Sequence, residues 1–142
     1  MYQMRGANMS MVLEKAEKVN LRDRDSRKRL AKTLTNLFDK WAIPVADQQV
    51  LLGFSPESRS TVNRYREGQP FADNRDLIGR AGHLLGIHKS LRVIFPHDRD
   101  LVYRWVSTPN RRFDNRTPLD IMKSGYEGVL AVRRYLDFER GR

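Results

Sequence analysis

Apolar residues recur at three- and four-residue steps along most of this 142-residue chain. In the first clear run, Leu30, Leu34, Leu37, Phe38 and Trp41 fall on one face, with Lys and Arg residues between them. This spacing follows the 3.6-residue turn of an α-helix, and we find no run with the alternation typical of a β-strand. The sequence therefore predicts an all-α fold.

Helix-breaking residues divide the chain into short segments. Pro44 and Pro96 end helices because proline cannot donate a backbone hydrogen bond, and Gly53, Gly68 and Gly86 suit the left-handed conformation that often follows a helix. The predicted helices span about 25–43, 45–53, 55–68, 73–86, 87–95, 98–108, 117–124 and 126–139. Residues 1–24 are predicted to form an N-terminal arm, with a short helix near 11–19.

The two short helices on either side of Gly53-Phe54-Ser55 predict a helix-turn-helix, a motif that places its second helix in the major groove of DNA. Val62 and Tyr65 are expected to face the core. Guanidinium, amide and hydroxyl groups can hydrogen-bond to bases and phosphates. The outward residues expected to do so are Arg59, Ser60, Asn63, Arg64 and Arg66.

The charge of the chain is strongly positive, with 27 Lys and Arg against 17 Asp and Glu. It is spread evenly, because residues 1–70 carry 13 basic and 8 acidic side chains and residues 71–142 carry 14 and 9. Such a balance favours binding of a polyanion such as nucleic acid. Solvated helix faces produce the same composition, so charge alone leaves both interpretations open.

Several functional classes lack support in the sequence. There is no cysteine, and His83, His88 and His97 have neither a consistent helical spacing nor clustered carboxylates, so no metal site is expected. Without a Gly-x-Ser-x-Gly turn or a glycine-rich phosphate loop, we expect neither catalytic residues nor a cofactor. Because signal-peptide and membrane-spanning patterns are also missing, we expect a cytoplasmic protein that does not enter the membrane.

An ordered set of residues in the second half of the chain resembles the Xre/MbcA/ParS antitoxin family. The set consists of Gly86-Ile87-His88-Lys89-Ser90-Leu91-Arg92-Val93-Ile94-Phe95-Pro96, Trp105, Pro109-Asn110, Phe113, Arg116-Thr117-Pro118-Leu119-Asp120 and Val132-Arg133-Arg134-Tyr135-Leu136. The resemblance covers about residues 45–140. It departs from the family at the front, where residues 1–24 match nothing that we can assign.

The resemblance implies an antitoxin that inhibits a RES-domain toxin, one that consumes NAD or transfers ADP-ribose, and that represses their shared operon as a homodimer on operator DNA. It identifies 58–66 as the recognition helix, which adds Ser58 and Thr61 to the expected DNA contacts. It also implies a toxin-binding module, to which we assign Arg116, Arg133, Arg134, Glu139, Arg140 and Arg142.

The expected organisation is an arm over 1–24, an Xre-like helix-turn-helix module over 25–72 and a helical module with the toxin-binding domain over 73–142. One alternative stays open at this point. The chain could be a stand-alone helix-turn-helix regulator of transcription whose C-terminal half serves only for dimerisation.

Overall fold

The computed structural model describes residues 23–142, and of Arg59 and Ser60 it describes the backbone alone. The expectations for the arm, including the helix near 11–19, thus lie almost entirely outside the described residues. The helices are α2 (Arg24–Lys40), α3 (Val45–Leu51), α4 (Arg59–Arg66), α5 (Arg75–Ile94), α6 (Arg99–Arg104), α7 (Pro118–Met122) and α8 (Tyr126–Arg140), with 3₁₀ turns at Trp105–Ser107 and Arg111–Phe113. Residues 23–142 contain no strand, which confirms the predicted all-α fold.

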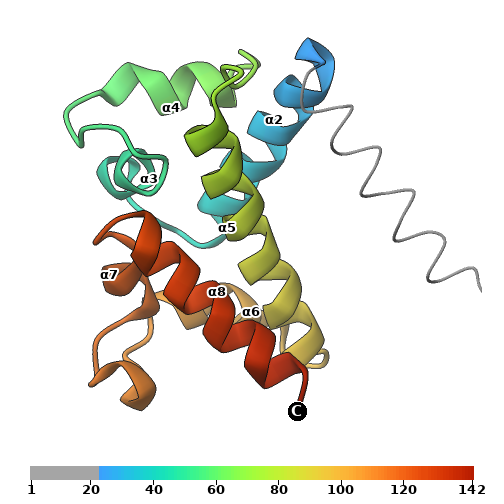
Figure 1. Ribbon diagram of the computed structural model, residues 1–142, viewed down its shortest axis with the longest axis vertical. Helices are drawn as coiled ribbons and strands as arrows, with labels where there is room; N and C mark the ends of the chain where they lie inside the picture. The colour runs from blue at the N-terminus through green and yellow to red at the C-terminus, as the bar shows by residue number, and fades with distance from the viewer. Residues whose placement is uncertain (1–22) are drawn as a thin grey trace, which may run out of the picture.

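Helix α5 runs through the middle of the molecule and is shared by two groups of helices (Figure 1). Helices α2, α3 and α4 form one group and α6, α7 and α8 the other, with α8 packed along α5 from Gly79 to Ser90. One continuous cluster of buried side chains joins both groups and includes Trp41 and Trp105. The two groups are therefore built on one hydrophobic core.

The predicted helix break at Gly86 is wrong, since α5 continues from Arg75 to Ile94. Gly86 instead allows α8 to come close. A Cβ atom at this position would lie 2.6 Å from Cζ of Arg133, and one at Gly79 would lie 2.5 Å from the hydroxyl oxygen of Tyr126. Both glycines serve the packing of α5 against α8.

Two predicted helix starts are displaced. Helix α5 was predicted to start at residue 73, but the side chain of Asn74 caps it by accepting a hydrogen bond of 2.9 Å from a backbone N–H three residues on. Helix α4 begins at Arg59 and not next to Ser55, whose carbonyl accepts the Ser58 N–H in a separate turn. The second helix of the motif is thus shorter than predicted.

Polar contacts also join the first group of helices to the second. Lys123, which follows α7, forms a salt bridge of 3.0 Å with Asp47 on α3. Arg80 on α5 donates to the carbonyl of Leu51 at 3.4 Å, and its guanidinium lies 5.3 Å from the ring centroid of Tyr126 on α8. Over the part of the chain that the structure describes, no helix is both long and apolar enough to span a membrane.

Candidate functional site

The turn between α3 and α4 is held by the buried side chain of Gln49. Its amide nitrogen donates to the carbonyls of Ser58 and Ser55, and its amide oxygen accepts from the backbone N–H of Val62 at 2.9 Å. One side chain on the first helix therefore satisfies backbone groups at the start of the second. Gln49 was not predicted from the sequence, because nothing there shows that this amide is fully buried.

The inner face of α4 is apolar, as predicted. Val62 is completely buried and Tyr65 is nearly so. The ring of Tyr65 packs edge-on against that of Phe71, with centroids 4.7 Å apart, and lies 6.4 Å from that of Phe54. These contacts fix which residues of α4 face outward.

Arg66 ties α4 to both neighbouring helices. Its guanidinium forms a salt bridge of 2.8 Å with Asp39 on α2 and donates to the side chains of Gln48 on α3 and Asn63 on α4. Lys32 on α2 donates to the carbonyl of Arg66. In the structure the Arg66 side chain therefore helps to position α4 against α2 and α3.

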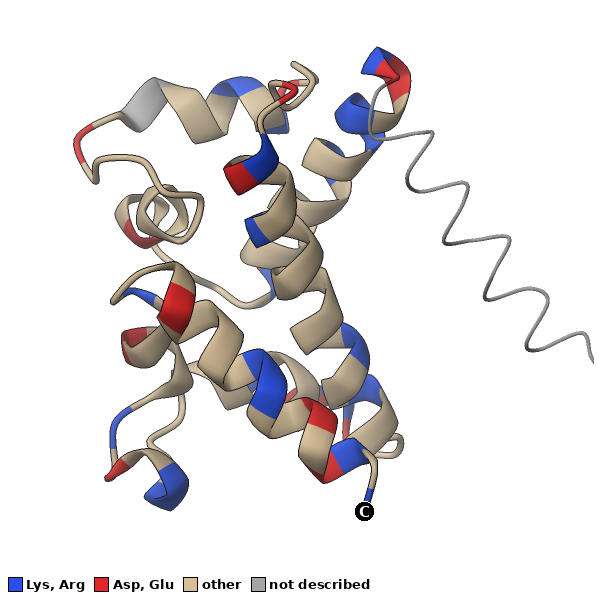
Figure 2. Ribbon diagram, viewed as in Figure 1, with Lys and Arg blue, Asp and Glu red and all other residues tan. Residues whose placement is uncertain are grey.

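The remaining residues predicted to bind DNA differ in their exposure. Asn63 and Arg64 are exposed, Ser58 and Thr61 are half-buried, and the side chains of Arg59 and Ser60 are not described. In Figure 2 the described basic residues of α4 lie in its C-terminal part, where Lys32 of α2 also contacts the helix. DNA contact by this surface stays a prediction.

The loop before α7 is pinned to α8 by aromatic rings. Tyr135 on α8 stacks against Trp105, with centroids 6.4 Å apart, and Phe113 packs edge-on against Tyr135 at 5.4 Å. The side chain of Thr117 accepts from the N–H of Asp120 at 3.0 Å and so caps α7 at its predicted start. Arg116 is exposed on this ordered loop.

His83 on α5 lies between two residues of α8. Its Nε2 is 3.1 Å from the hydroxyl of Tyr126, and its Nδ1 is 3.0 Å from Nη1 of Arg133. Arg133 also donates to the Gly82 carbonyl and approaches Asp137 at 3.6 Å. Arg133, predicted to bind the toxin, therefore connects α8 to α5 through a histidine whose role the sequence did not indicate.

This arrangement predicts that stability depends on pH. Burial lowers the pKa of His83 below its ordinary 6.5, and the charges of Arg133 and Arg134 lower it further. The unfolded chain then binds the proton more tightly, so the stability from neutral His83 is present above about pH 6.5 and is lost as pH falls toward the lowered pKa. We expect the free energy of unfolding in urea to decrease between about pH 7 and pH 5.

The variant His83→Gln should make that decrease smaller without abolishing it, because burial and the charges of Arg92 and Lys40 lower the pKa of His88 too. An equal decrease in the variant and the wild type would assign the pH dependence to other groups.

The C-terminal end of α8 is partly anchored and partly free. Arg140 donates to the hydroxyl of Ser90 on α5, and Glu139 pairs with Arg142 at 3.0 Å. Phe138 is 65% exposed, with the Arg142 guanidinium 5.9 Å from its ring centroid. Of the other predicted toxin contacts, Arg134 is exposed. The sequence analysis did not single out Phe138.

Comparison with known proteins finds a matching domain in the C-terminal part of the chain. Residues 90–142, which contain α6, the pinned loop, α7 and α8, match the model of the antitoxin Xre/MbcA/ParS C-terminal toxin-binding domain. This part of the chain is therefore similar to the toxin-binding domain of these antitoxins.

One curated relative covers more of the chain. The uncharacterized protein y4oB of Sinorhizobium fredii (strain NBRC 101917 / NGR234) is 36% identical to it over 104 residues, which are 72% of this chain and 78% of y4oB. The similarity therefore extends beyond the matched toxin-binding domain.

Proposed function

We propose that this protein is the antitoxin of a type II toxin–antitoxin pair, that it binds and inhibits a RES-domain toxin, and that it represses its own operon by binding operator DNA. The match of residues 90–142 to a toxin-binding domain carries the proposal. The pair α3–α4, with the shape of a helix-turn-helix and exposed Asn63 and Arg64, supports the DNA-binding part. The protein acts in the cytoplasm by binding, without catalysis.

The operator is contacted by a homodimer. Two recognition helices related by a twofold axis reach successive major grooves when they lie about 34 Å apart. Each α4 then contacts the bases of one operator half-site, and the Lys and Arg residues of α2 contact the flanking phosphates.

Co-expression tests the toxin-binding part. The protein encoded by the adjacent gene is expressed with and without this chain, and growth is measured. We expect toxicity that this chain abolishes, together with co-purification of the two proteins. An adjacent protein without a RES domain, or toxicity that persists, contradicts the proposal.

The exposed arginine on α4 provides a test of DNA binding. We expect Arg64→Ala to weaken operator binding by roughly 1–3 kcal/mol if Arg64 reads a base, and we expect wild-type binding to weaken steeply with salt. Fluorescence anisotropy with labelled operator DNA measures both effects. Arg104→Ala on α6 is the matched control. If the two variants bind operator DNA with equal affinity, Arg64 does not contact the DNA.

Truncation tests the role of the C-terminal tail in toxin inhibition, but only a short deletion leaves the fold intact. Deleting residues 110–142 would remove the buried Val129, Val132 and Leu136 and so destroy the core. We expect deletion of 139–142 to weaken toxin inhibition more than complex formation, because the buried part of α8 is kept although the hydrogen bond of Arg140 to Ser90 is lost. Inhibition curves and binding titrations on the same sample separate the two effects, and an unchanged inhibition curve places the blocking group elsewhere.

A further inference from the structure

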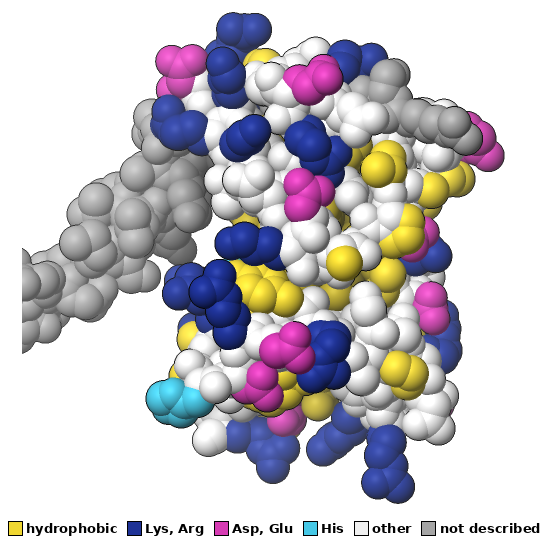
Figure 3. All heavy atoms as spheres, turned by 180° about the vertical axis from the view of Figure 1, so that it is seen from behind, with side chains coloured by type: hydrophobic (Ala, Val, Ile, Leu, Met, Phe, Trp, Pro, Cys, Tyr) yellow, Lys and Arg dark blue, Asp and Glu magenta, His cyan; other side chains and the backbone are white. Residues whose placement is uncertain are grey.

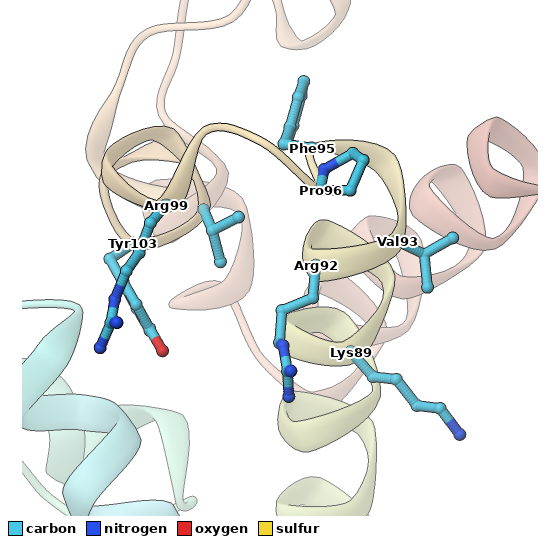
Figure 4. A pocket seen from close by; sticks show the side chains of 8 residues that line it. Lys89, Arg92, Val93, Phe95, Pro96, Arg99 and Tyr103 are labelled. Atoms are coloured by element: carbon cyan, nitrogen blue, oxygen red, sulfur yellow. The ribbon is translucent and has the colours of Figure 1, made fainter.

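A hollow of about 770 Å³ opens between the C-terminal part of α5 and helix α6, and we call it the α5–α6 hollow. Three cationic side chains line it, Lys89 and Arg92 from α5 and Arg99 from α6. In Figure 4 the guanidinium groups of Arg92 and Arg99 extend from their two helices to the same side, with the hydroxyl of Tyr103 beside Arg99. Two helices thus present forked hydrogen-bond donors to one space.

The positive charge of the hollow is not neutralised within residues 23–142. None of its three cations takes part in a salt bridge of this region. The acidic neighbours of Arg99 are engaged elsewhere, since Asp98 caps α6 and Asp100 pairs with Arg104 at 2.8 Å. Like charges that line one hollow repel one another, and a bound anion relieves that repulsion.

The positive region continues past Tyr103 to helix α2. Nζ of Lys40 lies 5.6 Å from the centroid of the Tyr103 ring, and His88 stacks against the same ring at 5.3 Å. Burial lowers the pKa of His88, and the charges of Arg92 and Lys40 lower it further, which is the effect expected of a positive potential.

Apolar side chains lie among these cations. Val93 is 50% exposed, and Phe95 and Pro96 also line the hollow. On the face seen in Figure 3, exposed apolar side chains at mid-height likewise have Lys and Arg side chains beside them. A DNA backbone offers mainly phosphates and sugars, whereas a polypeptide offers carboxylates together with large apolar side chains, which suits a hollow of mixed character better.

All residues lining the hollow except Lys89 fall within 90–142, the region that matches a toxin-binding domain. We propose that the α5–α6 hollow is a docking site for an acidic segment of the toxin, which places a carboxylate between Arg92 and Arg99 and an apolar side chain against Val93. This inference rests on the proposed function and adds to it a contact separate from the tail of α8.

The test uses the full-length antitoxin with Arg92→Glu and Arg99→Glu combined. Both side chains are exposed, so the variant should fold, and circular dichroism and thermal unfolding check this. The control is Arg75→Glu, the same charge reversal at the exposed N-terminal end of α5. Isothermal titration calorimetry measures the Kd for the purified adjacent-gene protein at low and high salt, and anisotropy measures the Kd for operator DNA.

We expect the double variant to bind the adjacent-gene protein at least about tenfold more weakly than the wild type, with less salt dependence. The control variant should bind that protein with the wild-type Kd. Neutral Arg92→Gln with Arg99→Gln should give a smaller loss. Unchanged affinity of the double variant overturns this inference alone, whereas a wild type that does not bind overturns the proposed function as well. A loss of operator affinity in the double variant would identify DNA as the occupant of the hollow, and a change in the antitoxin's own oligomeric mass would identify a second copy. Either result would also overturn this inference.

Discussion

Replacing Gly128 by alanine is expected to destabilise the protein by about 2 kcal/mol or more, because the added methyl group has no room. A Cβ atom there would lie 1.9 Å from the carbonyl oxygen of Ile121 and 2.6 Å from the hydroxyl of Ser124. That carbonyl is already held by hydrogen bonds from the hydroxyl and the N–H of Ser124. Relief of the clash therefore requires α7 to move away from α8.

Gly82→Ala is the matched control. A Cβ atom at Gly82 meets no heavy atom within 4 Å, so this change should stabilise α5 by up to about 1 kcal/mol through helix propensity. Urea denaturation of both variants measures the difference. Since α7 and α8 lie in the matched toxin-binding domain, Gly128→Ala should also weaken toxin binding, and a stability equal to that of Gly82→Ala would disprove the close packing.

Replacing Gln49 by leucine is expected to cost about 1–3 kcal/mol for each buried backbone group that loses its partner. The groups affected are the N–H of Val62 and the carbonyl of Ser58, which both bond to the Gln49 amide. Because these bonds set α4 against α3, operator affinity should fall together with stability.

Gln69→Leu makes the same chemical change at an exposed position beyond α4 and should leave stability within about 0.5 kcal/mol of the wild type. Urea denaturation and operator anisotropy are measured on both variants. A Gln49→Leu variant that keeps full operator affinity would show that α4 does not need this link.

The parts of the fold that follow from local pattern could be predicted from the sequence. The spacing of Leu34, Leu37 and Phe38 identified the buried face of α2, and Thr117-Pro118 marked the start of α7. The break at Gly86 could not be judged this way. Whether a glycine ends a helix or accommodates a neighbour depends here on Arg133, which is far away in the sequence.

The candidate sites show the same limit. Polarity indicated which residues of α4 face outward, yet Arg66 and Arg133 were predicted to contact partners and lie in hydrogen bonds within the protein. The cations of the α5–α6 hollow come from two helices, and only their packing brings Arg92 and Arg99 to one space. Long-range contacts of this kind have no signature in a single sequence.

The sharing of α5 by both groups of helices affects how specificity can be exchanged between relatives. The region that matches the toxin-binding domain begins at residue 90, inside α5, whereas His83 and Gly86 on the same helix contact α8. A graft cut at that boundary would join the α8 of one protein to the α5 surface of another. To acquire a new toxin specificity, a chimaera should therefore take α6, α7 and α8 from the donor together with the residues of α5 that contact them. The residues of α5 that face α2 should be kept from the recipient.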